Sequence, residues 1–298
     1  MSENKNLVVV RAGDQSLHPD WLKGDSSRNW DLIISYYGSQ KSLYENSGFE
    51  VVKDNGFKWD SLHRLFTNRP ELLEKYDTIW LPDDDLICSL ESINRLFDCS
   101  RDYDLSICQP SLTHDSYSSF QVTKANKYFR LRYTTFVEVM APCFNSAYLK
   151  EILPLLTYSS SGWGLDLVWC HLMADPLRKA AVIDEISVVH SRPIGKGTLY
   201  SDLKSAGKDN YQEQANVLSV CDIQPYRPRT YGGVLRSGKY VSAGLPLFFR
   251  VCLGINFYHD SLLGNIRKRS KYIFIYCGDW INKRLQPEKI HFAKSDIK

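Results

Sequence analysis

Three consecutive carboxylates, Asp83 to Asp85, are the residues of this sequence best placed to do chemistry. They follow a short apolar run, 78–81, that has the length and composition of a buried strand. Strand geometry directs Asp83 and Asp85 to one side and Asp84 to the other. Two carboxylates on one side can share a divalent cation, and such ligands suit Mg²⁺ or Mn²⁺. The alternative is an acidic turn that caps the next helix.

Two further stretches carry residues suited to ligand binding. In Gly162-Trp163-Gly164-Leu165-Asp166, the glycines allow a close approach of the backbone to a ligand. Trp163 offers a flat apolar face for a sugar ring or a base, and Asp166 falls in the first turn of the following helix. The alternative is that Trp163 belongs to the core and that Asp166 complements the helix dipole. His190 ends a β-branched run and can supply a neutral imidazole to a metal, although a lone histidine is more often a packed or surface residue.

The elements that must position these residues alternate between strand and helix. Apolar runs predict strands at 6–10, 30–37, 49–52, 78–81, 104–108, 180–189 and, as one or two strands, 128–142. Periodic stretches predict helices at 58–76, split near Pro70, from Ser89 onward, at 146–156 and at 165–173. Gln109-Pro110 is expected to close the strand before it. The alternation is typical of an α/β protein with helices on both faces of a sheet.

Composition limits the class of protein. The 298 residues are 43% hydrophobic, which supports a sizeable core in one large domain or one domain with an appendage. Residues 226–298 carry 14 Lys or Arg against 4 Asp or Glu, whereas the rest of the chain is acidic. We therefore predict a catalytic domain at 1–200 and a basic, aromatic appendage at 201–298.

Cysteine usage and the chain start indicate a location. The eight cysteines form no CxxC pair and no zinc-ligand spacing, so we predict that they are core side chains. The first residues form no signal peptide, and no apolar run reaches the ~18 residues of a membrane-spanning helix. We expect a cytoplasmic protein, peripheral on the inner face of the cytoplasmic membrane.

The order of strand-end acids, Gly-Trp-Gly-acid loop and strand-end histidine resembles the nucleotide-diphospho-sugar transferases of the GT-A fold. More closely, the sequence resembles the domain of unknown function 707 family over roughly residues 7–193. The matching stretches are 30–38, 58–59, 76–86, 106–110, 137–142, 163–166 and 182–190. The family has an aromatic residue and a central Glu where this chain has Pro82 and Asp84, and this departure keeps both outer acids.

This resemblance implies a GT-A-like (Rossmann-like) mixed sheet flanked by helices. It also implies that Asp83 and Asp85 hold the metal, that an acid at Asp166 serves the acceptor, and that His190 completes the metal shell. The cofactor would be Mn²⁺ or Mg²⁺, with a nucleotide-diphospho-sugar as donor substrate.

The chemistry of sugar transfer fits these residues. A departing diphosphate must be stabilised, and a metal on the acid pair does so as a Lewis acid. Inversion at the anomeric carbon needs a base for the acceptor hydroxyl proton. Asp166 is the first candidate, and Glu138 is the second because a polar residue inside an apolar run needs a partner when it is buried. Lys58, Asp84 and Trp163 are expected to contact the donor.

The basic appendage suggests a partner. Apolar residues 245–253, the basic cluster at 267–271 and the aromatic run at 272–276 suit the surface of an anionic membrane. The alternative is that the apolar stretches pack on the catalytic domain. No nucleic acid is expected, because the body of the chain shows no nucleic-acid-binding module.

These features predict a metal-dependent glycosyltransferase of the hexosyltransferase type. It would move a sugar, with inversion, from a nucleotide-diphosphate donor to a glycan or lipid-linked acceptor in surface polysaccharide synthesis. A nucleotidyl- or phosphotransferase could use the same acid pair, but Arg11-Ala12-Gly13-Asp14 is poor in glycine for a phosphate loop. A non-catalytic sugar-binding protein on a GT-A-like domain is the other alternative, and the intact set of acids and histidine argues against it.

Overall fold

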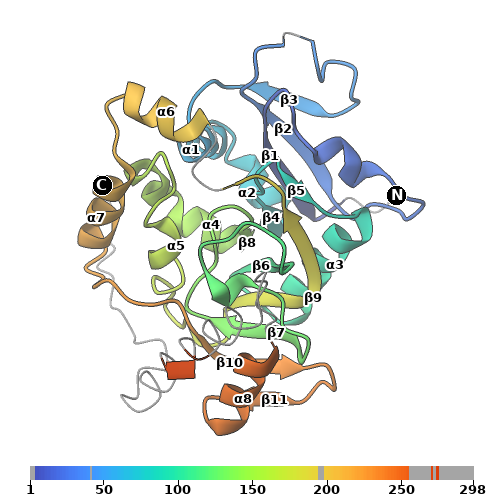
Figure 1. The fold of residues 1–298 in the computed structure, drawn as a ribbon. Helices are drawn as coiled ribbons and strands as arrows, with labels where there is room; N and C mark the ends of the chain where they lie inside the picture. The colour runs from blue at the N-terminus through green and yellow to red at the C-terminus, as the bar shows by residue number, and fades with distance from the viewer. Residues whose placement is uncertain (1–3, 41, 194–197, 255–269, 271–272, 275–298) are drawn as a thin grey trace.

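The computed structural model describes residues 4–40, 42–193, 198–254, 270 and 273–274. Within these residues eleven strands form one sheet (Figure 1), in the order β11-β10-β7-β9-β6-β8-β4-β1-β2-β3, with β5 paired to β9. The strands are β1 (Asn6–Ala12), β2 (Asp31–Tyr36), β3 (Glu50–Lys53), β4 (Thr78–Trp80), β5 (Leu86–Ile87), β6 (Ile107–Leu112), β7 (Phe129–Thr134), β8 (Cys143–Asn145), β9 (Ala180–His190), β10 (Thr230–Leu235) and β11 (Tyr240–Ser242).

The strands in the first half of the sheet are parallel, and the order in which they are added reverses at β1. β2 pairs with β1 on one side and β3 follows β2, both in parallel register. The chain then returns through helices α1 (Lys58–Asn68) and α2 (Glu71–Lys75) to β4, which pairs in parallel with the other side of β1. The strand order therefore reverses between β1 and β4. In open α/β sheets, ligands bind outside the carboxyl ends of the strands at such a point.

The second half of the sheet is mixed. β8 lies antiparallel between β4 and β6, and β9 is parallel to β6 but antiparallel to β7. The predicted class, an α/β protein with a mixed sheet, is confirmed. β10 and β11 extend the sheet beyond β7. The predicted boundary at residue 200 stays a prediction, but the described residues after it share this sheet.

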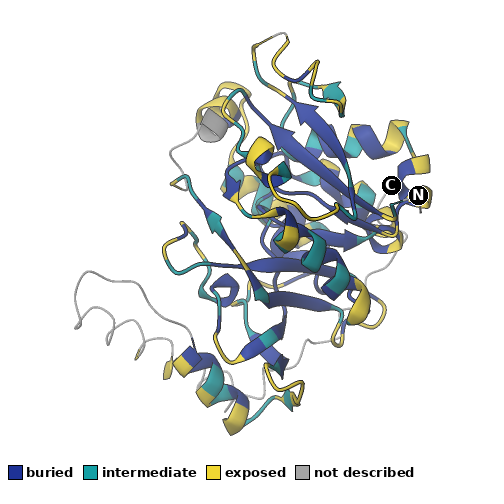
Figure 2. Ribbon diagram, turned by 90° about the vertical axis from the view of Figure 1, so that its right-hand side faces the viewer, coloured by how far each residue is buried: buried dark blue, intermediate teal, exposed yellow. Residues whose placement is uncertain are grey.

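Helices cover both faces of the sheet, as alternate residues of β1 show. Leu7 and Val9 belong to a core cluster shared with α1, α2 and α4 (Ser146–Ile152), and also with α5 (Leu165–Val168) and α7 (Asn210–Val220). Val8 and Val10 belong to a second cluster shared with α3 (Leu90–Asp102) and the 3-10 turn at His18–Leu22. Figure 2 shows the central strands almost wholly buried. Burial on both faces explains why these strands read as continuous apolar runs.

Two helices lie outside these clusters, and two short 3-10 helices complete the described elements. The helices are α6 (Thr198–Ser205) and α8 (Leu245–Gly254), and the 3-10 helices are Gln121–Thr123 and Leu153–Tyr158. Side chains cap three of the helices: Ser89 accepts from the backbone of Ser92 at the start of α3, Asn145 caps α4, and Asp209 caps α7.

Three elements predicted from the sequence are present in the structure with a different extent. β6 continues through Pro110 to Leu112, with an irregularity after the proline, because its pairing with β8 ends at Cys108 and the edge beyond tolerates a missing donor. The helix predicted at 165–173 is the short α5, which ends at Val168. The stretch 128–142 holds one strand, β7, and the residues that follow it are irregular. The predicted split of 58–76 at Pro70 is confirmed.

The other sequence-based statements concern cysteines and membrane segments. Seven cysteines in the described residues are free, and six of them are buried, as predicted. No helix in the described part of the chain is both long and apolar enough to cross a bilayer. Cys277, and almost all of the predicted basic cluster at 267–271 and aromatic run at 272–276, lie outside the described residues.

Candidate active site

The three acids Asp83 to Asp85, here called the aspartate turn, lie at the reversal point of the sheet. A bridge between Arg11 and Asp83 continues the pairing of β1 past the end of β4. On the other side of the turn, Leu86 of β5 pairs with His190 at the end of β9. The turn is therefore held between the carboxyl ends of β1 and β9, which is the position expected for a ligand site in this kind of sheet.

Asp85 and His190 form the most buried pair of the site. His190 Nε2 lies 3.2 Å from Asp85 Oδ2, and His190 Nδ1 donates to the carbonyl oxygen of Tyr117 at 2.7 Å. Burial alone would lower the pKa of His190, but the bond to Asp85 and the charge of Asp85 raise it to about 9. The other carboxylate oxygen, Asp85 Oδ1, is buried without a hydrogen-bond partner. A buried acceptor of this kind is unusual and needs an explanation.

Asp83 is the most accessible acid of the turn, with 38% of its side chain exposed. Lys58, the first residue of α1, donates to Asp83 Oδ1 at 2.6 Å and to the carbonyl oxygen of Val139 at 2.8 Å. Burial raises the pKa of Asp83, against the Lys58 ammonium, which lowers it. The Lys58 ammonium thus occupies a place at which a cation is stabilised.

Asp84 faces away from Lys58 and is held by the protein. Its Oδ2 accepts from the backbone N–H of Gly13 at 2.7 Å, and its Oδ1 accepts from Arg192 at 3.1 Å. Burial raises the pKa of Asp84 to about 6. Asp84 therefore ties the loop after β1 to the segment after β9. Its predicted contact with the donor stays a prediction.

Glu138 lies in the irregular segment after β7, next to the aspartate turn. The backbone N–H of Asp83 donates to the carbonyl oxygen of Met140, two residues after Glu138, at 2.7 Å. The backbone N–H of Glu138 donates to the Gln109 side chain, whereas the carboxylate oxygen Oε2 is buried without a partner. Burial raises the pKa of Glu138 to about 7, against the charge of His190, which lowers it. A buried carboxylate with one oxygen free of hydrogen bonds and a pKa raised to about 7 is suited to proton transfer.

Trp163 lies between the two glycines predicted to bring the backbone close to a ligand, and Asp166 follows them. Gly162 and Gly164 both have positive φ angles, of 85° and 93°, and a Cβ on Gly162 would lie 2.3 Å from Trp59 Nε1. Burial, and then the charge of Glu138, raise the pKa of Asp166 well above its usual range. The Trp163 ring meets Tyr211 of α7 edge to face, with 5.1 Å between centroids. The glycines thus serve close packing here, and the donor contact of Trp163 stays a prediction.

The metal assignment has to be tested against these contacts. Among the described residues, no group of three or more His, Cys, Asp or Glu side chains is arranged to hold a metal ion. Lys58 and His190 instead bind the two outer acids of the turn. The donor set of carboxylate oxygens and an imidazole nitrogen still suits Mn²⁺, and the unpartnered Asp85 Oδ1 offers it an acceptor. The residues present therefore fit a divalent cation that displaces these protein contacts.

Sequence reasoning missed two arginines at this edge. Arg11, at the carboxyl end of β1, is buried and donates to Ser35 Oγ at 2.9 Å and to the carbonyl oxygen of Asp54 at 2.6 Å. Arg192, two residues after His190, holds Asp84 and donates to the carbonyl oxygen of Gln15 at 2.5 Å. A charged residue inside the otherwise apolar run of β1 was the available signal for Arg11.

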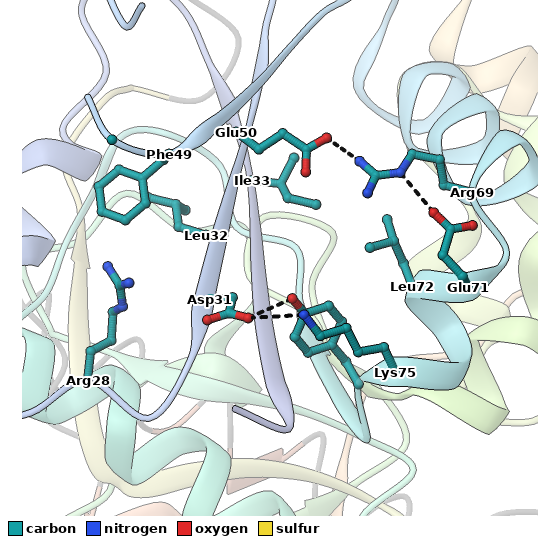
Figure 3. Close-up of a pocket in the computed structure, with 12 residues that line it drawn as sticks. Arg28, Asp31, Leu32, Ile33, Phe49, Glu50, Arg69, Glu71, Leu72 and Lys75 are labelled. Atoms are coloured by element: carbon teal, nitrogen blue, oxygen red, sulfur yellow. Dashed lines mark hydrogen bonds and ion pairs between the residues drawn. The ribbon is translucent and has the colours of Figure 1, made fainter. Parts of the chain in front are cut away.

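A cavity of about 350 Å³ lies elsewhere, between β2, β3 and α2 (Figure 3). Its charged residues are largely paired with one another: Arg69 binds Glu50 and Glu71, and Lys75 lies 3.7 Å from Asp31. Asp31 begins β2, so this cavity lies at the amino end of that strand, away from the edge that carries the aspartate turn.

Comparison with known proteins gives a family and several distant structures. A family model described as "Protein of unknown function (DUF707)" matches residues 26–231. Residues 1–349 of TarS from S. aureus are 12% identical, with 63% of this chain and 60% of that chain covered and a TM-score of 0.41. The mannosyltransferase PcManGT from Pyrobaculum calidifontis, in complex with GDP-Man and Mn²⁺, is 9% identical, with 75% and 65% covered and a TM-score of 0.48.

A third structure is glucosyl-3-phosphoglycerate synthase from Mycobacterium tuberculosis, in complex with Mn²⁺, UDP-Glc and phosphoglyceric acid. It is 13% identical, with 76% of this chain and 86% of that chain covered and a TM-score of 0.45. This chain spans less than two thirds of the first two structures, and all three TM-scores lie below 0.5, so these likenesses carry no argument about function. No curated protein matches the sequence. The family match covers more than half of the chain, and on that ground the protein belongs to the DUF707 family of proteins of unknown function.

Proposed function

We propose that this protein is a metal-dependent glycosyltransferase of the GT-A type that uses a nucleotide-diphospho-sugar donor. The observation that carries the proposal is the aspartate turn at the strand-order reversal between β1 and β4, with one buried oxygen of Asp85 left unpartnered. A ligand with a diphosphate fits the carboxyl edge of such a sheet. A divalent cation would explain both the clustered acids and the unsatisfied acceptor.

In this proposal Asp83, Asp85 and His190 hold Mn²⁺ or Mg²⁺. The bound cation would supply Lewis-acid stabilisation of the departing nucleoside diphosphate. Lys58 is then released from Asp83 to donate to a phosphate oxygen, which keeps its charge paired. Asp84, through Gly13 and Arg192, keeps the turn in place against the ends of β1 and β9. Trp163 lines the sugar side of the site.

The base that takes the acceptor hydroxyl proton is an acid near the turn. Glu138 has an unpartnered oxygen and a pKa of about 7, which suits a base at neutral pH. Asp166, the first candidate from the sequence, already accepts hydrogen bonds from backbone N–H groups at the start of α5. We therefore assign the base to Glu138 and retain Asp166 as a neighbour that shapes its charge. The donor sugar moves with inversion to a hydroxyl of a glycan or lipid-linked acceptor, the hydroxyl proton passes to Glu138, and the nucleoside diphosphate leaves.

Calorimetry with Mn²⁺ and a panel of UDP- and GDP-sugars tests the proposal. Wild type is expected to bind at least one donor in the presence of Mn²⁺. Asp85→Ala is expected to lose ~10-fold or more in affinity, since even groups that only orient metal ligands cost 10- to 100-fold. Asp25→Ala, which removes an exposed carboxylate in the loop before β2, is the matched control and should bind as wild type does.

The released product separates the proposal from its rival. A glycosyltransferase releases a nucleoside diphosphate. A nucleotidyltransferase acting on the same donor transfers a nucleoside monophosphate and releases the sugar 1-phosphate. Phosphorus NMR of the reaction mixture distinguishes the two. Unchanged donor affinity in a folded Asp85→Ala variant would overturn the metal assignment, and absence of binding to any sugar nucleotide would overturn the proposed function itself.

A further inference from the structure

Helix α8 has two apolar faces, and the described part of the chain covers one of them. Leu247 and Val251 are fully buried against Phe129 of β7. Leu245, Phe249 and Leu253 are 52%, 54% and 50% exposed. Their spacing of four residues places these three side chains in one stripe along the helix. Figure 2 shows this mixture of buried and exposed residues in the helix next to the β10–β11 hairpin.

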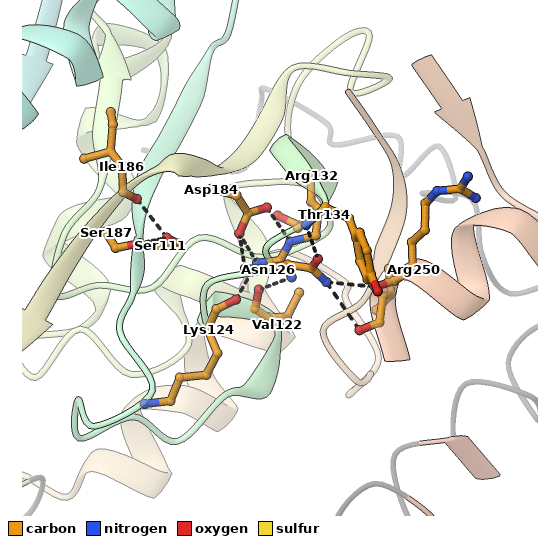
Figure 4. Close-up of polar contacts among 12 residues, drawn as sticks. Ser111, Val122, Lys124, Asn126, Arg132, Thr134, Asp184, Ile186, Ser187 and Arg250 are labelled. Atoms are coloured by element: carbon orange, nitrogen blue, oxygen red, sulfur yellow. Dashed lines mark hydrogen bonds and ion pairs between the residues drawn. The ribbon is translucent and has the colours of Figure 1, made fainter. Parts of the chain in front are cut away.

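The covered face is fixed to the sheet by buried polar contacts, so the position of the stripe is fixed as well. Asn126 donates through its side chain to the carbonyl oxygens of Arg250 and Val251, at 3.1 and 3.3 Å. The backbone N–H of Asn126 donates in turn to Asp184, which is paired with the buried Arg132 (Figure 4). A Cβ on Gly254 would clash with the Asn126 side chain, which shows how closely the end of α8 approaches.

The surroundings of the stripe are cationic. Residues 223–254 contain five Lys or Arg and no Asp or Glu, and residues 116–137 contain four and none. Most of these cations are exposed or half-buried; they include Lys127, Arg130, Arg236, Lys239 and Arg250. The two acids on β9 are both paired: Asp184 is fully buried on Arg132, and Glu185 is paired with Arg95 of α3.

These cations belong to the same end of the molecule as the stripe. The backbone of Arg236 donates to Tyr128, and Arg130 donates to the carbonyl oxygen of Arg236, so the β10–β11 turn lies against the start of β7. The backbone of Lys127 donates to Gly254 at the end of α8. Tyr128 and Tyr240 are 37% and 43% exposed there and add amphipathic rings. Figure 4 shows the Arg250 side chain extending away from the buried network.

We propose that this end of the molecule docks on an anionic lipid bilayer, with Leu245, Phe249 and Leu253 entering the interface and Lys127, Arg236 and Lys239 facing lipid headgroups. An apolar stripe bordered by cations is the arrangement that binds such surfaces. Nucleic acid would use the cations but not the stripe. The 44 residues after Gly254 carry nine Lys or Arg against four Asp or Glu, so the chain that leaves α8 adds to the attraction. This inference does not depend on the proposed enzymatic activity.

Vesicle sedimentation with the full chain tests the docking face. Wild type is expected to bind vesicles of phosphatidylcholine and phosphatidylserine, and to bind less as ionic strength rises. The triple variant Leu245→Ser, Phe249→Ser, Leu253→Ser and the double variant Arg236→Gln, Lys239→Gln are each expected to lose ~10-fold or more in binding. The controls are at exposed positions elsewhere: Leu43→Ser for the apolar variant, and the double variant Lys23→Gln, Lys150→Gln for the cationic one. Both should bind as wild type does.

A depth measurement separates the bilayer from other occupants of the stripe. Phe249→Trp is expected to be quenched by brominated lipid chains, whereas Leu43→Trp is not. The proposal would be overturned if the triple serine variant sedimented with vesicles as well as the wild type does. It would also be overturned if Phe249→Trp were not quenched while the protein is bound to vesicles. Either result would leave a protein surface or the chain after Gly254 as the occupant of the stripe. Equal binding to pure phosphatidylcholine would overturn the assignment to anionic lipid. None of these results requires a sugar donor, so they are independent of the test of the proposed function.

Discussion

Asp184, in β9, and Asp85, just before the strand β5 that pairs with β9, are both buried carboxylates, and they differ in how their oxygens are used. Asp184 Oδ2 accepts from Arg132 Nε at 2.7 Å, and its Oδ1 accepts from Arg132 Nη2 and from the backbone of Asn126. Arg132 also donates to the carbonyl oxygens of Val122 and Lys124, and both charged side chains are 0% exposed. Asp85, in contrast, bonds to His190 through one oxygen and leaves the other unpartnered.

The difference indicates two purposes for buried charge. The Asp184–Arg132 pair is closed, and all its bonds join β7, β9 and the segment that anchors α8, so its role is structural. The region of Asp85 and Glu138 keeps two buried acceptors unsatisfied, each at a cost of about 1–3 kcal/mol. Such groups call for an explanation, and a ligand or a catalytic use is the one proposed for these two. The predictions below test this contrast.

The largest effect is expected from opening the closed pair. Arg132→Ala leaves a buried carboxylate without its partner and should lower the free energy of unfolding by about 3–5 kcal/mol. The double variant Arg132→Met, Asp184→Leu removes both charges and should be more stable than Arg132→Ala. Urea unfolding followed by circular dichroism measures both. A loss below ~1 kcal/mol in Arg132→Ala would mean that the pair is not the structural element we describe.

The pH dependence of stability should distinguish the open region from the closed one. Glu138 has a pKa of about 7 in the folded protein and 4.5 ordinarily. Below 4.5 it is protonated in both states; as the pH rises towards 7, only the unfolded chain ionises, so the folded state binds more protons and loses stability. The shift corresponds to roughly 3 kcal/mol, all of it lost above pH 7.

The measurement is the difference in unfolding free energy between wild type and Glu138→Gln, followed from about pH 4 to about pH 8. The difference should move against wild type as the pH rises, because the amide does not titrate. A difference that is flat across this window would show that Glu138 is solvated or paired in solution. The same experiment on Asp102→Asn, an exposed acid at the end of α3, serves as control and should show little change.

Which parts of this molecule the sequence could predict follows from what local patterns encode. The strands β1, β2 and β4 were predictable because burial on both faces produces uninterrupted apolar runs, and Ser89 marked the start of α3 by its capping side chain. The aspartate turn was predictable as a site because it follows such a strand. The short extent of α5 was not, because its end depends on packing that has no local signal.

The partners of the site residues could not be predicted from the sequence. Nothing local says that Lys58 reaches Asp83 or that Arg192 reaches Asp84, because these contacts join segments 25 and 108 residues apart. The insertion of β8 between β4 and β6 decides which loops meet at the aspartate turn, and only the folded sheet contains that information. The two faces of α8 were hidden for the same reason: the sequence shows one apolar run, and the sheet determines which half of it is covered.

Transfer kinetics should separate the two candidate bases. Glu138→Gln is expected to bind donor and lose transfer by ~10² or more, the usual scale for a general base. Asp166→Asn should lose less, because backbone N–H groups already bond to its carboxylate. Steady-state rates with a saturating donor, together with NMR of the product anomer, give both results. If Asp166→Asn is inactive while Glu138→Gln retains most of its rate, the roles are exchanged; a retained anomeric configuration would remove the need for either base.

The smallest effect is expected at Ser89. This substitution tests whether donor affinity depends on the ligand contacts of the aspartate turn or only on the stability of the segment around it. Ser89 lies four residues after Asp85, and its hydroxyl oxygen accepts from the backbone N–H of Ser92 at 3.2 Å. Ser89→Ala removes this cap and should lower the free energy of unfolding by about 1 kcal/mol. Donor affinity in the presence of Mn²⁺ should stay at the wild-type value, because β5 holds the turn to β9 independently of the cap. Asp85→Ala should instead lower donor affinity ~10-fold or more, and it should also lose stability because it leaves the buried His190 without its partner. If Ser89→Ala lowers donor affinity as strongly as Asp85→Ala, the turn is sensitive to any loosening of this segment, and the contrast between an open, ligand-directed Asp85 and a closed, structural Asp184 fails.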